Sequence, residues 1–379
     1  MKGIVINMRN FGFGVMRLPL FDDSDSKNVD YDKAYEMIKL YMDSGFSYFD
    51  TGYMYHNYYS ENVLRDLLVK RFPRESFQLA DKLPVFSLKN KEAVPLVFDE
   101  QLRRCGVDYF DYYLLHCLSA EFYDPKCEPF GCFEFISEKK KEGKVREIGF
   151  SYHDKAELLD RILTEHPEVD FVQLQINYLD WEDEKIQSRK NYEVARRHGK
   201  KIVIMEPVKG GTLVNVPDEV VKLFKDFAPD RSVASWALRY AAGLPGVFMT
   251  LSGMGNMDQL TDNITTMSNF EPLSDAELEV IEKATAIIRS TVGIPCTSCG
   301  YCIESGCPVN VNIPKYFELY NEYKMCKRSP EECNVFYKRY SKNFGKASDC
   351  IACGKCEKAC PQKIKVRDEL KKVKDIFEG

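Results

Sequence analysis

The residues whose spacing most clearly points to chemistry are cysteines near the C-terminal end of the chain. Eight of the fourteen cysteines fall into two runs, and each run ends in Cys-Pro. Three thiolates at two-residue spacing, with a more distant fourth before a proline, are typical of the ligands of a 4Fe-4S cluster. The sequence therefore predicts two clusters, and the eight candidate ligands are Cys296, Cys299, Cys302, Cys307, Cys350, Cys353, Cys356 and Cys360.

The fourth cysteine of each run is expected to serve the cluster of the other run, as in two-cluster ferredoxins. Cys360 then completes the first site and Cys307 the second. The first run has one residue more than the usual three before its fourth cysteine, which a loop can absorb.

Zinc and disulfide bonds are the rival interpretations of these thiols. Zinc ribbons use two Cys-x2-Cys pairs and need neither a third cysteine two residues on nor Cys-Pro. Disulfides belong to oxidising compartments, whereas this chain begins Met-Lys-Gly-Ile-Val-Ile-Asn without an apolar leader. We expect a reducing, cytoplasmic location, and no run approaches the ~18 apolar residues that a membrane span needs.

Length and charge narrow the class of protein. A chain of 379 residues with 44% hydrophobic content can form one large domain and one small one. Its 53 basic and 58 acidic residues give a net charge of −5, which argues against a nucleic-acid partner.

The region before the cysteines alternates short β-branched and aromatic runs with amphipathic helical stretches. Eight such alternations in roughly 250 residues predict a (β/α)8 barrel, an α/β fold of the TIM type. A doubly wound sheet is the alternative, but the first run lacks the Gly-rich phosphate loop usual there. The expected strands are 11–18, 46–50, 77–82, 111–116, 146–151, 171–176, 201–206 and 247–251.

Polar side chains close three consecutive runs, where a barrel of this type places its chemistry. Asp50, Lys82 and His116 each follow an apolar stretch, and a buried lysine needs a counter-charge such as Asp50. Tyr55 lies five residues after Asp50, and we expect the Lys82 cation to lower the pKa of its phenol towards working pH. Cys117 is expected to pack away from the site, because adjacent strand residues face opposite sides.

These residues resemble the aldo-keto reductase family. The similarity lies in Asp50-Thr51-Gly52-x2-Tyr55, Lys82 and Leu114-Leu115-His116, and it extends from about Gly12 to Asn263. With its tail, the chain resembles the subgroup fused to a ferredoxin-type domain. The resemblance implies reduction of an aldehyde or ketone by hydride from NADPH or NADH, with Tyr55 as proton donor, Lys82 and Asp50 tuning it, and His116 orienting the carbonyl oxygen.

The resemblance also implies where the dinucleotide lies. Ser151 and Gln173 would hold the nicotinamide amide, with Tyr152 standing where the family has asparagine and Gln175 as a substitute. The loop from Glu206 to Leu213, with Val208 and Gly210, would lie along the pyrophosphate. Near the adenine, the segment from Ser252 to Gln259 carries no cation for a 2′-phosphate, which makes NADH plausible. The remaining candidates there are Gly253, Gln259 and Asn263.

Three functions stay open at this point. The chain is a carbonyl reductase with structural or sensing clusters, a one-electron reductase fed by ferredoxin through its clusters, or an electron-transfer subunit. Joining hydride chemistry to one-electron clusters calls for a flavin or radical intermediate, so a flavin is a further candidate cofactor. We expect domains at 1–288 and 289–379, and a substrate pocket shaped by the aromatic loop from Leu118 to Gly131.

Overall fold

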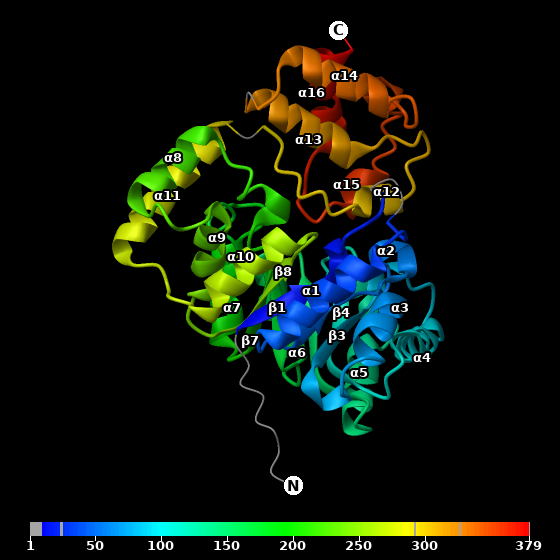
Figure 1. The fold of residues 1–379 in the computed structure, drawn as a ribbon. Coiled ribbons are helices and arrows are strands. Elements are labelled where there is room, and N and C mark those ends of the chain that lie inside the picture. Colours follow the sequence, from blue (N-terminus) through cyan, green and yellow to red (C-terminus); the bar gives the residue numbers. More distant parts are fainter. Residues whose placement is uncertain (1–9, 23–25, 292, 326, 379) are drawn as a thin grey trace. The chain divides into compact units, whose positions relative to one another are not determined.

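A computed structural model describes residues 10–22, 26–291, 293–325 and 327–378. Eight parallel strands pair in chain order, and β8 closes on β1 to make a barrel (Figure 1). The strands are β1 (Phe11–Gly14), β2 (Tyr48–Asp50), β3 (Gln78–Leu83), β4 (Phe110–Leu118), β5 (Val145–Tyr152), β6 (Phe171–Gln175), β7 (Lys201–Met205) and β8 (Val247–Gly253). The predicted (β/α)8 barrel is therefore confirmed.

Every strand differs from its expected run by one residue or more, and β1 and β4 differ most. β1 is shorter than predicted, because a 3-10 turn at Val15–Arg17 follows Gly14 directly. β4 extends past His116, but its pairing with β5 is irregular between Leu115 and Leu118, and Cys117 has a φ of +63°.

Helices connect the strands, and several begin and end where the apolar periodicity predicts. Gly45, Gly106, Gly143 and Gly199 have positive φ after their helices, as expected for left-handed C-caps. The helices between strands are α1 (Tyr31–Asp43), α2 (Tyr55–Tyr58), α3 (Ser60–Leu64), α4 (Ala93–Cys105), α5 (Cys132–Lys141), α6 (Ala156–Glu165), α7 (Ser188–Arg197), α8 (Asp218–Phe227) and α9 (Val233–Ala242), and α10 (Met257–Ser268) follows β8.

The barrel interior is filled by large side chains from alternate strands. Tyr48, Tyr112, Phe171, Met249 and Leu251 belong to one buried cluster. The barrel is thus a packed core.

Residue contacts divide the chain into two compact units whose boundary is not a single point. The first unit contains residues 1–207 and 234–273, and the second contains 208–233 and 274–379. Helix α8 packs against α11 (Asp275–Thr291) in the second unit. The boundary predicted at 288 stays a prediction.

The second unit also carries the cysteine runs. Its described residues form helices and one isolated parallel bridge between Val311 and Gly345. Tyr316, Phe317, Tyr337 and Phe377 lie in its core, together with three candidate ligand cysteines, Cys302, Cys356 and Cys360. Its remaining helices are α12 (Tyr301–Glu304), α13 (Ile313–Lys324), α14 (Pro330–Tyr340), α15 (Lys355–Ala359) and α16 (Val366–Phe377).

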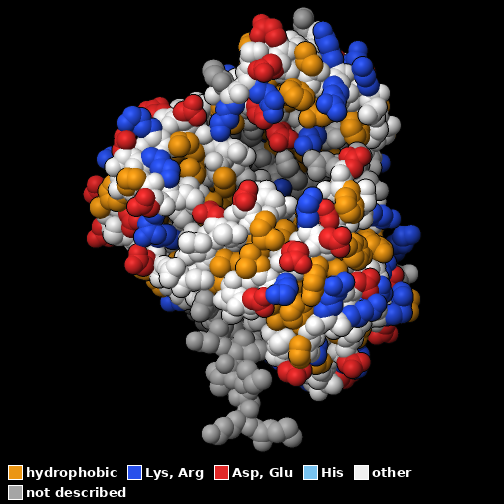
Figure 2. Space-filling model, viewed as in Figure 1, with side chains coloured by type: hydrophobic (Ala, Val, Ile, Leu, Met, Phe, Trp, Pro, Cys, Tyr) orange, Lys and Arg blue, Asp and Glu red, His pale blue; other side chains and the backbone are white. Residues whose placement is uncertain are grey.

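The molecular surface carries both charge signs. Lys and Arg side chains are interspersed with Asp and Glu over the face seen in Figure 2. No helix within the described ranges is long and apolar enough to cross a bilayer.

Candidate functional site

Asp50, Lys82 and His116 meet at the carboxyl ends of β2, β3 and β4. Lys82 Nζ donates to Asp50 Oδ1 at 2.6 Å and also to the carbonyl oxygen of Thr51. Asp50 and Lys82 are 4% and 1% exposed. A charge pair this deeply buried is costly to leave incomplete, because removing one partner strands the other without solvent.

Tyr55 lies between the Lys82 ammonium and the His116 imidazole. Lys82 Nζ is 4.8 Å from the centre of the Tyr55 ring. The Tyr55 and His116 rings meet edge-on, with their centres 5.9 Å apart. The structure thus brings together all four residues that the resemblance implies for the reaction.

The expected effect on the Tyr55 pKa is only partly correct. Burial raises the pKa of Tyr55 to about 12, and the Lys82 cation opposes this without overcoming it. Burial and the Lys82 cation together hold the pKa of His116 well below its ordinary value. At neutral pH the phenol is therefore a protonated donor and the imidazole is neutral.

A buried acidic cluster behind Lys82 escaped the sequence analysis. Asp81 and Glu61 are both fully buried, and Arg104 pairs with Glu61 at 3.1 Å. Asp81 accepts the backbone N–H of Lys82 at 2.8 Å, and Cys105 Sγ lies 3.8 Å from its other oxygen. Burial and the neighbouring Glu61 carboxylate hold the pKa of Asp81 well above its usual range. One feature of the sequence could have indicated this cluster, because Asp81 directly precedes the strand-end Lys82.

The strand alternation assumed for Cys117 breaks at this residue. Cys117 has a positive φ, and the pairing of β4 with β5 is irregular there. Its backbone N–H donates to Ser151 Oγ at 2.7 Å. The expected packing of Cys117 away from the site stays a prediction.

Aromatic rings border His116 on the substrate side. The Phe86 ring lies 5.5 Å from His116 and 6.1 Å from Phe122. Phe122 belongs to the loop predicted to shape the pocket, whereas Tyr123 of the same loop is fully buried.

The predicted nicotinamide contacts lie on β5 and β6. Gln173 is 3% exposed, and its Oε1 has no hydrogen-bond partner among the described residues. An orphaned buried acceptor of this kind fits the amide of a nicotinamide. Gln175 is less suited as a substitute, because its amide donates to Asp180 at 2.8 Å. Tyr152 donates to the carbonyl of Lys155.

The other predicted nucleotide contacts are divided between the two units. Glu206 belongs to the first unit, whereas Val208 and Gly210 belong to the second. In the first unit, Gln259 Oε1 accepts the N–H of Gly255 at 2.8 Å, and Asn263 donates to Ser252 Oγ at 2.9 Å.

A cation missing from the β8 segment is supplied from the turn after β1. A Cβ added at Gly253 would meet Arg17 Cδ at 3.2 Å, so the Arg17 side chain runs along this segment. The barrel closure places β1 beside β8, which explains how a residue so distant in sequence arrives there.

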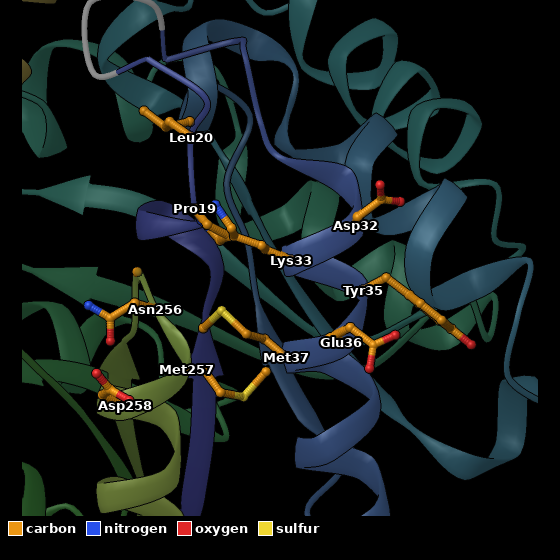
Figure 3. Close-up of a pocket in the computed structure, with 11 residues that line it drawn as sticks. Pro19, Leu20, Asp32, Lys33, Tyr35, Glu36, Met37, Asn256, Met257 and Asp258 are labelled. Atoms are coloured by element: carbon orange, nitrogen blue, oxygen red, sulfur yellow. The ribbon is translucent and has the colours of Figure 1, made fainter.

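A hollow opens beside the start of α10 (Figure 3). Met37 of α1 and Met257 of α10 lie next to each other in its wall. Its charged lining consists of three carboxylates and one ammonium, from Asp32, Glu36, Asp258 and Lys33. Lys33 pairs with Asp30 at 3.0 Å.

The cysteines of the second unit gather in two groups. A small cavity is lined by Cys307 together with Cys350, Cys353 and Cys356. Burial raises the pKa of Cys302, and negative charge on Cys296, Cys360 and Cys356 adds to this effect, so these thiols are close neighbours. None of the described cysteines forms a disulfide.

All eight candidate cysteines are free thiols, the ligand type that 4Fe-4S clusters use. Within the described part of the chain, no three His, Cys, Asp or Glu side chains group closely enough to hold a single metal ion. A cubane cluster is larger, and its ligands stand around its corners. Backbone N–H groups also reach two of the sulfurs, from Ser298 to Cys296 at 3.5 Å and from Val311 to Cys307 at 3.4 Å.

Comparison with known families decides the classification. Residues 10–286, well over half of the chain, match the Aldo/keto reductase family. The chain belongs to the aldo/keto reductase family. Residues 295–364 match the 4Fe-4S dicluster domain, so this aldo/keto reductase carries a cluster-type domain after its barrel.

Its relatives are distant oxidoreductases. An uncharacterised oxidoreductase of Schizosaccharomyces pombe is 24% identical over 272 residues, covering 69% of this chain and 81% of that protein. The NADH-specific methylglyoxal reductase of Escherichia coli is 24% identical over 192 residues, covering 46% of this chain and 54% of that protein.

Solved structures share the barrel. The aldo-keto reductase AKR11C1 of Bacillus halodurans superposes with a TM-score of 0.59 at 23% identity, covering 73% of this chain and 91% of that one. A Klebsiella pneumoniae aldo/keto reductase in complex with NADP and acetate gives 0.58 at 18% identity, over 73% and 91% of the two chains. At these identities the likeness concerns the fold alone.

Proposed function

We propose that this aldo/keto reductase reduces an aldehyde or ketone to an alcohol, with Tyr55 as the proton donor. The observation that carries the proposal is the buried Lys82–Asp50 pair under the Tyr55 ring, with neutral His116 at the ring edge. A binding module would gain nothing from a desolvated lysine and aspartate aimed at a phenol.

Each of the four side chains has its own role in the reaction. A bound nicotinamide supplies the hydride that reaches the carbonyl carbon. His116 donates a hydrogen bond that orients the carbonyl oxygen, and Tyr55 gives its phenolic proton to that oxygen as negative charge develops. Lys82 then stabilises the phenolate, and Asp50 keeps the ammonium charged and in place.

Phe86 and Phe122 give the pocket next to His116 an apolar wall, which favours an apolar or ring-bearing carbonyl.

The eight cysteines are proposed as ligands of two 4Fe-4S clusters, with Cys307 completing the second site and Cys360 the first. Nothing in the site calls for a flavin.

We propose NADH as the preferred cofactor. Ser151 and the unpaired Gln173 would hold its amide, and Arg17 suits the pyrophosphate, which both nicotinamide cofactors share. The hollow beside α10 carries more carboxylates than cations, which suits a ribose diol and repels a 2′-phosphate. The Escherichia coli relative is NADH-specific by name. We expect a higher kcat/KM with NADH than with NADPH, and the reverse order would contradict this assignment.

The test of the reaction is Tyr55→Phe, assayed with NADH and a panel of aldehydes that includes methylglyoxal. Loss of the proton donor should lower kcat by a factor of about 10² to 10⁴, with the visible spectrum and the circular dichroism unchanged. Tyr58→Phe is the matched control, because Tyr58 is 45% exposed and lies in the same turn. Equal turnover by the two variants would remove Tyr55 as the donor.

A further inference from the structure

The segment after β7 contacts the parts of the second unit that carry cysteines. Lys209–Gly211 forms a 3-10 turn that belongs to the second unit, only a few residues after Met205 ends β7. It contacts both arms of the chain that carry the proposed ligands of the first cluster site. One arm contains Cys296 and the other contains Cys360.

The contact with the first arm is between backbones. A Cβ added at Gly210 would lie 2.2 Å from the carbonyl oxygen of Thr297, the residue after Cys296. Gly210 also has a φ of +61°. Only glycine permits this approach, so the turn is seated directly on the loop that holds Cys296.

The contact with the second arm is made by a buried cation. Lys209 is 2% exposed, and its Nζ donates to Gln362 Oε1 at 3.4 Å. Gln362 is buried and lies two residues after Cys360 in the chain. Its side chain therefore joins the Lys209 ammonium to the arm that carries Cys360.

The backbone of Lys209 itself is constrained. Its φ of +47° is unusual for a residue with a side chain, and such a conformation persists only where the surroundings hold it. The fold thus keeps a lysine turned inward at a place where burying a charge is expensive.

We propose that Lys209 raises the reduction potential of the first cluster, which makes it the preferred electron acceptor of the two. A cluster held by four thiolates is a net anion, and its reduction adds one more negative charge. A cation in a buried setting stabilises that charge far better than one in water, and net charge is one of the factors that set cluster potentials. This proposal rests on the ligand assignment proposed above.

The consequence is a direction for electron movement within the second unit. When the second cluster is reduced and the first is oxidised, one electron passes from the second to the first. The electron then resides on the cluster beside the Lys209–Gly211 turn. The charge of the first cluster is therefore the one that acts on the Lys209–Gly211 turn.

The experiment is a redox titration of the anaerobic full-length protein with dithionite, followed by electron paramagnetic resonance. Lys209→Met should lower the midpoint potential of one cluster and leave the other unchanged. We expect at least a tenfold change in the one-electron equilibrium, which corresponds to 59 mV. Lys209→Gln retains a hydrogen-bond donor without the charge and should behave like Lys209→Met, whereas Lys209→Arg should stay near the wild-type value.

Several outcomes would overturn the proposal. It fails if both potentials are unchanged or shift equally, if Lys209→Gln matches the wild type, or if Lys209→Arg shifts as much as Lys209→Met. Lys363→Met is the matched control, because Lys363 lies three residues after Cys360 but is exposed, so its removal should shift the potential less.

Failure of the cluster assignment itself would look different. In that case the wild-type protein would lack iron and paramagnetic signals after reduction. If both uncharged variants lost about half of the iron while Lys209→Arg kept all of it, the cation would be holding the first cluster in place and not setting its potential, which would count against the proposal. Loss of iron in Lys209→Arg as well would count against it.

Discussion

At the scale of single residues, the site is governed by a competition between burial and one cation. Burial raises the pKa of the Tyr55 phenol and lowers that of the His116 imidazole. Lys82 opposes the first shift and adds to the second. The result is a proton donor and a neutral hydrogen-bond donor side by side, which is what carbonyl reduction at neutral pH requires.

This competition predicts the pH dependence of reduction. Tyr55 has a pKa of about 12 and stays protonated, and His116 stays neutral because its pKa lies well below the ordinary value. For a non-ionising aldehyde, kcat/KM should therefore be nearly flat between about pH 6 and 9. An acidic limb near the ordinary histidine pKa that disappears in His116→Gln would show that this histidine is protonated in the free enzyme.

At the scale of elements, β3 is tied to α3 and α4 by buried polar groups. Asp81 of β3 faces Glu61 of α3, and Arg104 and Cys105 of α4 reach the same point. Gln101 of α4 also donates to the carbonyl of Lys82 at 3.0 Å. The backbone of Lys82 is thus held by a side chain from outside the barrel, so its position depends on how these helices pack.

Asp81→Asn should change how stability depends on pH. The pKa of Asp81 is raised in the folded state, so the folded protein keeps a proton that the unfolded chain has lost, and stability falls as pH rises above the ordinary aspartate value. Asparagine does not ionise, so the variant does not lose stability in this way as the pH rises. As the pH increases from about 5 to 8, the melting temperature of Asp81→Asn should rise relative to that of the wild type. The expected rise is about 2–4 °C for each kcal/mol of unfolding free energy that the wild type loses and the variant keeps.

The measurement is thermal unfolding followed by circular dichroism at several pH values. Asp258→Asn is a suitable control, because Asp258 lies at the open hollow beside α10. A constant difference between Asp81→Asn and wild type across the pH range would mean that Asp81 is ionised in the folded protein.

At the scale of the whole molecule, the chain combines an aldo/keto reductase barrel with a 4Fe-4S dicluster domain. The second unit includes residues 208–233 from within the barrel sequence. Within this unit, the two cysteine arms contact Gly210 and Lys209.

Cys353→Ser should remove one cluster and spare the other. Cys353 lines the cavity with Cys307, Cys350 and Cys356, so its loss leaves that site with three thiolates. Iron and sulfide should fall by about half, with the barrel unchanged. Cys333→Ala is the control, because Cys333 is buried in the same unit away from ligand spacing. Full iron content in Cys353→Ser would refute its role as a ligand.

The sequence by itself predicted the barrel, the second domain and the candidate reaction residues, because these depend on local signals. Strand ends marked by Asp50, Lys82 and His116 need only the periodicity of the chain and the rule that parallel strands share an edge. The cysteine runs carry their ligand spacing in a few consecutive residues.

Only the tertiary structure decided which distant residues join these sites. Arg17 reaches the β8 segment because the barrel closes, the alternation of faces breaks at Cys117 because β4 is irregular, and Lys209 is buried against Gln362. The balance between burial and the Lys82 cation at Tyr55 also depends on packing. Desolvation and long-range contact arise from residues far apart in the chain, and no local pattern contains that information.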